Sequence, residues 1–241
     1  MLNVNEHIIP FSFSGNIPDT DIGFAISADS IDSDSIFALM KWIINTIIDR
    51  YGTLKVRFSV IAYGSIVTTR FTFDNTKFTQ EDLIRAVNET QQVSGTPDLL
   101  MALEEAEILF RKSSRPNATR VLVVLSDVVG LANDSELTAC AGRLRKQGVL
   151  ILSAGFGPQA NQIGKQMEKV VVSQSDYMDV GNFSTKRPVV IAEKIMFKAL
   201  QGMLVPLKNQ PRDERYTFPS FLCILQIIRA CFSMQPVNLV T

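Results

Sequence analysis

Val121-Leu-Val-Val-Leu-Ser-Asp127 is a run of five apolar residues that ends on a hydroxyl and a carboxylate. An uninterrupted apolar run of this length is typical of a strand in the middle of a parallel sheet whose two faces are both covered. Helical patterns lie on both sides of it, and the one that follows begins at Asp134 or Ser135. The run therefore predicts a central strand of an α/β domain.

Short apolar runs alternate with amphipathic helical segments along the rest of the chain. The other runs lie at 22–26, 56–62, 67–73, 149–153 and 177–180, and apolar residues at helical spacing occupy 36–51, 83–87, 99–110, 137–144, 163–169 and 190–200. This alternation predicts a doubly wound, mostly parallel central sheet with helices on both faces. The link between 56–62 and 67–73 is too short for a crossover, so these two strands are expected to be antiparallel.

Capping residues mark where several helices begin and end. Thr79 and Asp82 have the spacing of a capping box. Thr96 is expected to be the N-cap of the next helix, with Pro97 at its first position. Gly148 is expected to stop the helix over 137–144.

The charge balance excludes one class of partner. The 241 residues include 24 Lys and Arg against 24 Asp and Glu, and the two signs are interspersed along the chain. A non-specific binder of nucleic acid or of an anionic membrane needs a basic excess. We therefore expect no nucleic acid among the partners.

Histidine and cysteine usage narrows the possible chemistry. The only histidine, His7, precedes any periodic segment, so Ser-His-Asp and Cys-His nucleophile systems and most histidine zinc sites are not expected. Cys140 lies on the apolar side of a helical pattern and is expected to be a buried free thiol. Cys223 and Cys231 could pair with each other, and three cysteines do not decide the redox compartment.

The expected organisation is an N-terminal extension over 1–19, one domain over 20–204 and an irregular, proline-punctuated tail over 205–241. No apolar run reaches the length of a membrane span, and the first ten residues lack the features of a signal peptide. Four Asn-x-Ser/Thr sequons nevertheless favour an extracellular, secreted glycoprotein whose export signal is missing or unrecognised. The sequons begin at Asn88, Asn117, Asn133 and Asn182.

Glycine motifs of nucleotide sites are weak here. Gly155-Phe-Gly157-Pro-Gln-Ala160 matches a dinucleotide-binding pattern, but it follows a late strand and has a proline in the turn. A loop with two glycines explains it better. The spacing from Gly157 to Gly164 does not fit a P-loop, and no Gly-x-Ser-x-Gly nucleophile motif occurs.

Oxygen-bearing side chains gather where predicted strands end. The first strand runs into Ser27-Ala28-Asp29-Ser30-Ile31, the central strand ends at Asp127, and Thr96 begins a helix that lies between them in the sequence. Carboxyl ends of parallel strands meet at one edge of a doubly wound sheet, where ligands bind. Carboxylates and hydroxyls at that edge predict a hard-oxygen site suited to Mg²⁺, Mn²⁺ or Ca²⁺.

Four segments together resemble a von Willebrand factor type A domain of the extracellular-matrix and adhesion type, as in collagens, matrilins and integrins. They are Asp21-Ile-Gly-Phe-Ala-Ile-Ser27, Ser94-Gly-Thr-Pro-Asp98, Val121–Asp127 and Gly148–Gly157, and the resemblance spans about residues 20–204. It implies a Rossmann-like sheet with one antiparallel edge strand, a role in protein binding, and no catalytic activity.

The resemblance also implies where a metal-ion-dependent adhesion site (MIDAS) would lie. The family pattern is Asp-x-Ser-x-Ser, followed later by a Thr and an Asp. Here Ser27 stands in place of the first Asp, Asp29 replaces the first Ser, and Ile31 replaces the second, whereas Thr96 and Asp127 match. The site therefore resembles a degenerate MIDAS, with no metal or only weakly bound Mg²⁺, Ca²⁺ or Mn²⁺.

Two hypotheses for function follow. In the first, the chain is an interaction module that binds a matrix or cell-surface protein without metal through the crest, which we define as loops 27–35, 94–98 and 127–134. In the second, Asp29, Thr96 and Asp127 hold a divalent cation that a partner's carboxylate completes. An enzyme is not expected, because no histidine or activated nucleophile accompanies Asp29 and Asp127. A glycan on Asn133 would obstruct the crest.

Overall fold

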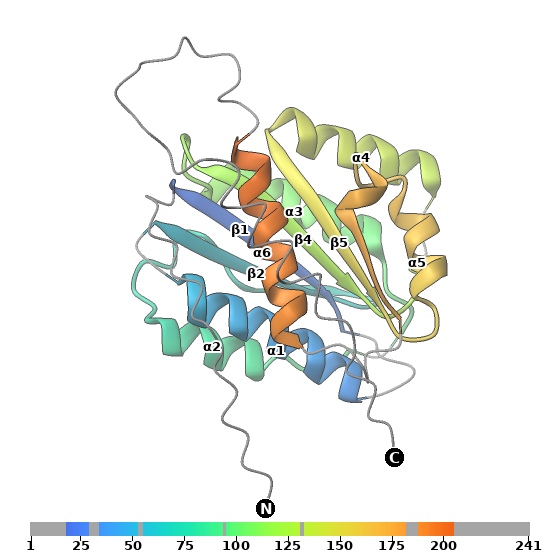
Figure 1. Cartoon of the computed structure of the whole chain (residues 1–241), viewed down its shortest axis with the longest axis horizontal. Coiled ribbons are helices and arrows are strands. Elements are labelled where there is room, and N and C mark those ends of the chain that lie inside the picture. Colours follow the sequence, from blue (N-terminus) through green and yellow to red (C-terminus); the bar gives the residue numbers. More distant parts are fainter. Residues whose placement is uncertain are drawn as a thin grey trace, which may run out of the picture. The chain divides into compact units, whose positions relative to one another are not determined.

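The computed structural model describes residues 18–28, 34–52, 55–93, 95–130, 133–181 and 188–204, with the backbone only for 201–204 (Figure 1). The described part of the predicted domain is a sheet covered by helices. The proposed limits of the domain at 19/20 and 204/205 stay a prediction, because the segments 1–17 and 205–241 lie outside the described residues, as do Cys223, Cys231 and Asn182.

In the described part of the chain, six strands form one sheet in the order β3-β2-β1-β4-β5-β6. All neighbours are parallel except β2 and β3, which are antiparallel, so β3 is the antiparallel edge strand. This arrangement confirms the predicted fold class. The strands are β1 (Thr20–Ser27), β2 (Val56–Tyr63), β3 (Val67–Phe71), β4 (Thr119–Ser126), β5 (Val149–Phe156) and β6 (Tyr177–Gly181).

Helices cover both faces of this sheet. The sheet lies between helices (Figure 1). The core on one face includes residues of α1, α2 and α6, and the core on the other face includes residues of α3, α4 and α5. A short 3₁₀ helix, Gln174–Asp176, precedes β6. The α-helices are α1 (Asp34–Tyr51), α2 (Gln80–Asn88), α3 (Leu99–Ser113), α4 (Asp134–Lys146), α5 (Ala160–Met167) and α6 (Pro188–Leu204).

The central strands supply both cores by alternation. Phe24 and Val123 belong to the core beneath α1 and α6. Their chain neighbours Ala25 and Val124 belong to the core beneath α3 and α4. Cys140 of α4 lies in the second core as a buried free thiol, as predicted, and burial raises its pKa to about 11.

Most of the predicted helix limits hold, but the start of α3 differs. Thr79 and Asp82 form the capping box of α2, and Gly148 follows α4 with φ +77°. The N-cap of α3 is Asp98, not Thr96, and its carboxylate accepts from the Met101 N–H at 3.1 Å. Pro97 therefore precedes the helix.

Packing of the loop before α3 explains that difference. Gly95 has φ +112°, a conformation that no helix contains. The Asp98 N–H donates to the Gly64 carbonyl at 3.0 Å, and a Cβ on Gly130 would come within 2.9 Å of the Pro97 carbonyl oxygen. The loop is thus held against two neighbouring loops, and the helix begins only after Asp98.

The glycine motif after β5 makes room for an aromatic ring. A Cβ on Gly155 would lie 2.1 Å from the Tyr177 hydroxyl, and one on Gly164 would lie 2.8 Å from the same ring. The Tyr177 hydroxyl donates to the Ala160 carbonyl. This packing agrees with the interpretation of the motif as a loop with two glycines, because Gly155 makes room for the Tyr177 ring.

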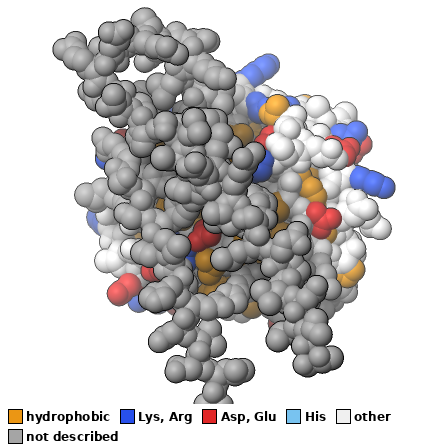
Figure 2. Space-filling model, viewed as in Figure 1, with side chains coloured by type: hydrophobic (Ala, Val, Ile, Leu, Met, Phe, Trp, Pro, Cys, Tyr) orange, Lys and Arg blue, Asp and Glu red, His pale blue; other side chains and the backbone are white. Residues whose placement is uncertain are grey.

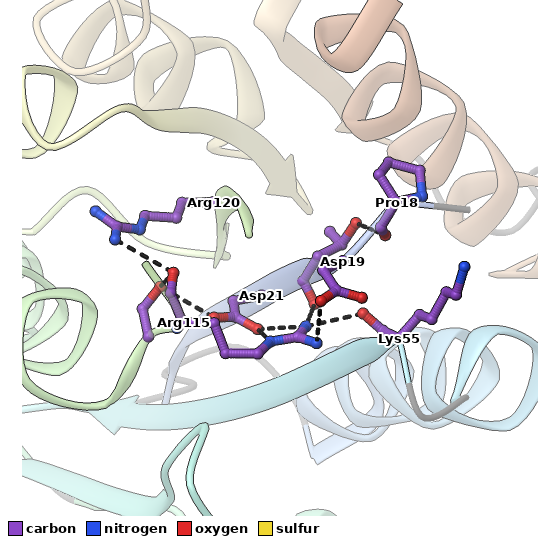
Figure 3. Close-up of polar contacts among 8 residues, drawn as sticks. Pro18, Asp19, Asp21, Lys55, Arg115 and Arg120 are labelled. Atoms are coloured by element: carbon purple, nitrogen blue, oxygen red, sulfur yellow. Dashed lines mark hydrogen bonds and ion pairs between the residues drawn. The ribbon is translucent and has the colours of Figure 1, made fainter. Parts of the chain in front are cut away.

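A buried ion pair joins three segments at the amino end of the sheet (Figure 3). The Asp21 side chain is fully buried and accepts from the Arg115 side chain at 2.7 and 2.9 Å, from the Arg115 N–H at 2.7 Å, and from the Ser114 hydroxyl at 3.0 Å. Arg115 also donates to the Thr20 and Lys55 carbonyls, each at 2.8 Å. The α3–β4 connection is thereby tied to the start of β1 and to the α1–β2 connection.

Within the described residues, no helix is both long enough and apolar enough to cross a membrane.

Candidate functional site

The crest brings two of the predicted site residues into direct contact. Strands β1 and β4 are adjacent and parallel, with Ile26 opposite Leu125, so they deliver Ser27 and Asp127 side by side. The Ser27 hydroxyl donates to Asp127 Oδ1 at 2.5 Å, and the Asp127 N–H donates to Ser27 Oγ at 3.3 Å. Both residues are buried, with Ser27 at 0% and Asp127 at 5% exposure.

Thr96, the third predicted residue, lies on the neighbouring loop and is exposed. Backbone bonds place this loop beside the end of β1, since the Val93 N–H donates to the Ala28 carbonyl at 2.9 Å. Within the described part of the chain, no hydrogen bond joins Thr96 to Ser27 or to Asp127. Asp29, the fourth predicted residue, lies outside the described residues, as does Ile31.

Two glutamines fix the loop that follows Asp127. Gln166 Nε2 donates to the Gly130 carbonyl at 2.7 Å, and its Oε1 accepts from the Gly130 N–H at 3.2 Å. Gln159 Oε1 accepts from the Val129 N–H at 3.4 Å. Sequence reasoning missed this role, because a glutamine about 30 residues downstream carries no local signal of the loop that it meets.

A tyrosine of β2 lies beneath the same edge. Tyr63 is 1% exposed, and burial raises its pKa well above the ordinary value for a phenol. The Asp127 carboxylate raises that pKa further, and a hydrogen bond with Ser126 opposes the rise. Ser126 itself donates to the Val128 carbonyl at 2.8 Å. The Tyr63 and Ser126 side chains beneath the crest are therefore neutral and hydrogen-bonded, and they lie beside the Asp127 carboxylate.

The donors described so far do not fit a tight divalent-cation site by themselves. In the described ranges, no three His, Cys, Asp or Glu side chains gather as a metal-binding group. The Ser27 hydroxyl already donates to the one predicted carboxylate ligand that is described, Asp127. Mg²⁺ requires near-octahedral oxygen coordination and Ca²⁺ takes six to eight oxygens.

Comparisons with known proteins agree with this fold. A sequence profile of the von Willebrand factor type A domain matches residues 21–187. Proximal thread matrix protein 1 from the mussel byssus is similar at 17% identity with a TM-score of 0.65, over 74% of this chain and 47% of that one. A structure of the same mussel protein with a zinc-occupied MIDAS motif is 21% identical with a TM-score of 0.65, over 77% and 46%.

These matches differ in what they establish. At such identities the mussel structures show the fold alone, and the present chain spans about half the length of the solved structures that it matches. The profile match, in contrast, extends over most of the chain and reaches from β1 to β6. The chain belongs to the von Willebrand factor type A domain family.

Proposed function

We propose that this chain is the interaction module of an extracellular-matrix or cell-adhesion protein, and that its crest binds a partner protein without a resident metal. Von Willebrand factor type A domains are protein-interaction modules, and the crest is the edge where ligands bind in doubly wound sheets. The observation that carries the metal-free part is the buried hydrogen bond from Ser27 to Asp127, at 2.5 Å.

With serine at position 27, Asp127 meets a neutral hydroxyl where the family pattern has a second carboxylate. A serine at position 27 removes one carboxylate from the crest, and its hydroxyl proton takes up a lone pair of Asp127 that a cation would use. Asp127 therefore has its charge stabilised from within the protein. A divalent ion would have to displace this bond and would gain only one described carboxylate in return.

Three observations support a matrix or cell-surface protein as the partner. The mussel relative in fold is a byssal thread matrix protein. In the coloured part of the face seen in Figure 2, Lys and Arg side chains stand among Asp and Glu side chains, and the chain as a whole has no basic excess of the kind that nucleic-acid binding needs. Three of the four sequons lie in the described residues, each with an exposed asparagine: Asn88, Asn117 and Asn133.

The sequon at the crest limits what can approach it. Asn133 is the N-cap of α4, and its Oδ1 accepts from the Ser135 N–H at 3.0 Å. Its Nδ2 is the atom to which an N-linked glycan attaches, so a glycan and the cap are compatible. A glycan on Asn133 would cover the α4 side of the crest and leave the side of Thr96 open.

We also propose that the chain is not an enzyme. The single histidine is His7, which lies outside the described residues, and among the described residues no histidine stands beside the Ser27 hydroxyl, which donates to the Asp127 carboxylate.

The alternative is a cation-dependent adhesion domain that uses Asp29, Thr96 and Asp127. It is favoured by the position of Thr96 on a loop bonded to the end of β1, and by the zinc-occupied MIDAS of the mussel protein. A partner's carboxylate would then complete the coordination of the cation.

Thermal unfolding of the full chain separates the two proposals. The protein is unfolded after treatment with a chelator and again in millimolar Mg²⁺, Mn²⁺, Ca²⁺ or Zn²⁺, beside Asp127→Ala. Metal-free binding predicts no shift in Tm. A ligand at about 100 times its Kd stabilises by ~2.7 kcal/mol, or roughly 5–11 °C at this size. A shift of that order that disappears in Asp127→Ala would establish the cation-dependent alternative.

A further inference from the structure

A cavity of about 480 Å³ lies at the amino end of β2, the end opposite to the crest. Three parts of the chain enclose it: the first residues of β2, the segment 72–78 that follows β3, and the facing ends of α1 and α2. Its volume is within the usual range for pockets that hold small molecules. The apolar side chains in its lining are those of Ile48, Val56, Phe58, Phe73, Phe78 and Leu83.

The apolar lining has a buried part and an accessible part. Ile48, Phe58 and Phe73 are buried and form the inner wall, whereas Leu83 is half-buried and Phe78 is 46% exposed. Three of the six apolar side chains are phenylalanines, and aromatic rings pack well against further rings in edge-to-face or offset geometry. The cavity is therefore open to solvent on the side of Phe78 and suited to an aromatic group.

Contacts among the lining residues hold the walls in place. Gln80 Nε2 donates to the Ile48 and Asp49 carbonyls at 2.9 and 2.7 Å, which ties the start of α2 to the end of α1. In the segment 72–78, the Phe78 N–H donates to the Asn75 carbonyl at 3.2 Å. The cavity is thus preformed, and a ligand would not have to order its walls on binding.

Arg57 is the only charged residue among the described residues that line the cavity. In the described ranges its side chain has no hydrogen-bond or ion-pair partner. Asp21 is opposite Arg57 in the sheet but is engaged by Arg115, and Asp74 accepts from the Thr72 hydroxyl. A guanidinium is permanently charged and matches the geometry of a carboxylate. The lining therefore favours an anion over a cation.

We propose that this cavity binds a small aromatic carboxylate, with its ring among the phenylalanines and its carboxylate on the guanidinium of Arg57. Arg57 and Phe58 are consecutive in β2, so their side chains point to opposite faces of the sheet, yet both border the cavity. This is possible because β3 pairs with β2 only from Val60 onward. The ring and the carboxylate of the ligand are consequently separated by a short flexible spacer.

An NMR titration of the uniformly ¹⁵N-labelled full chain with 4-phenylbutyrate tests the proposal. A Kd of about 1 mM or tighter is expected for a ligand of about 12 non-hydrogen atoms. The amide shifts should be confined to 72–78 and to the adjoining ends of α1, α2 and β2. Benzoate, which has no spacer, and 4-phenylbutylamine, which has the opposite charge, are each expected to bind at least roughly tenfold more weakly.

Substitutions in the lining separate the charge from the ring. Arg57→Glu is expected to weaken 4-phenylbutyrate binding at least roughly tenfold and to favour 4-phenylbutylamine instead. Phe78→Ala, at an accessible site, is expected to weaken binding roughly two- to tenfold. Lys146→Glu is the matched control, because it makes the same change of charge at an exposed site on α4, outside the cavity lining. It is expected to bind as the parent chain does.

The outcomes that would overturn the proposal do not bear on the crest. They are no amide shift at millimolar 4-phenylbutyrate, shifts scattered over the surface, or equal losses for Arg57→Glu and Lys146→Glu. Circular dichroism shows whether each variant is folded. If Arg57→Glu does not fold, the parent chain decides the question, since equal binding of 4-phenylbutyrate and 4-phenylbutylamine would exclude a role for the guanidinium. Asp127→Ala is expected to leave this binding unchanged.

Discussion

Strand β1 carries a buried polar residue near each end, and the two are satisfied in different ways. Asp21, at the amino end, is paired with the guanidinium of Arg115 and accepts main-chain and hydroxyl donors as well. Ser27, at the carboxyl end, donates its hydroxyl to the carboxylate of Asp127. The carboxylate at the amino end is thus paired with a cation, whereas the carboxylate at the carboxyl end is paired with a neutral hydroxyl.

The difference separates a structural role from a binding role. The carboxylate of Asp21 is enclosed by donors from the α3–β4 connection and has no exposed surface. Asp127 keeps a small exposed fraction beside the exposed Thr96, on the edge where ligands bind in this class of fold. We therefore expect changes at the amino end to affect folding, and changes at the crest to affect folding less and the response to ligands more.

The largest effect is expected for Arg115→Ala. Removing the guanidinium leaves Asp21 as a buried charge without its main partner, which costs about 3–5 kcal/mol of unfolding free energy. Guanidinium chloride unfolding measures this loss. Arg143→Ala is the matched control, because Arg143 pairs with Glu107 at 2.8 Å but is 46% exposed, and its loss should stay below about 1 kcal/mol. Similar losses of unfolding free energy for the two variants would contradict the distinction between the buried ion pair of Asp21 and an exposed ion pair.

Ser27→Asp tests whether the crest can be returned to a metal site. The new carboxylate would face Asp127 at hydrogen-bonding distance, and we expect about 3–4 kcal/mol of destabilisation at neutral pH. Repulsion raises the pKa of the folded pair, so the loss should shrink as the pH falls and one carboxyl is protonated. Millimolar Mg²⁺ should restore Tm in this variant only. Equal Tm values with and without Mg²⁺ would show that the remaining crest donors cannot hold the cation.

Ser27→Ala measures the crest hydrogen bond itself. Loss of a buried donor to a carboxylate is expected to cost about 1.5–3 kcal/mol. Ser153→Ala provides the control, because Ser153 is also buried in a neighbouring part of the sheet, but its hydroxyl has no described partner. That substitution should be neutral or slightly stabilising in urea unfolding. If the two alanine variants behaved alike, the hydrogen bond would contribute nothing.

Gln166→Ala should have the smallest effect and the most local one. It removes two hydrogen bonds to the Gly130 backbone, at a cost of about 1–2 kcal/mol. Hydrogen exchange should quicken at the Gly130 amide and in its loop, while the amides of β1 keep their protection. Unchanged exchange at Gly130 would mean that Gln166 does not hold the crest loop.

Hydrophobic periodicity was sufficient to predict the sheet and its helices, because each element buries a face whose pattern is local. The start of α3 could not be predicted that way. Thr96 and Pro97 satisfy the local rules for a helix start, but contacts with the loops at Gly64 and Gly130 hold them outside the helix. Asp98 was the overlooked signal, since aspartate is among the preferred N-cap residues.

The edge of the sheet at which Ser27 and Asp127 lie was predictable, but the bond between them was not. The order of the strands brings the ends of β1 and β4 together at one edge, and a backbone bond from Val93 to Ala28 places the loop of Thr96 beside the end of β1. That Ser27 donates directly to Asp127 depends on side-chain geometry between residues 100 positions apart. The Asp21 ion pair was missed for a related reason: a carboxylate in an apolar strand requires a partner, but the chain has 24 Lys and Arg to choose from.

The central place of β1 also has a consequence for the timing of synthesis. Its buried carboxylate is translated 94 residues before the arginine that neutralises it. At about 5–20 residues per second, a ribosome needs roughly 5–20 s to cover that interval. Until then Asp21 can be satisfied only by water, and β1 lacks its β4 neighbour. Of the described strands, β1 is made first, but it is completed only after β2 and β3 have been made and β4 has followed.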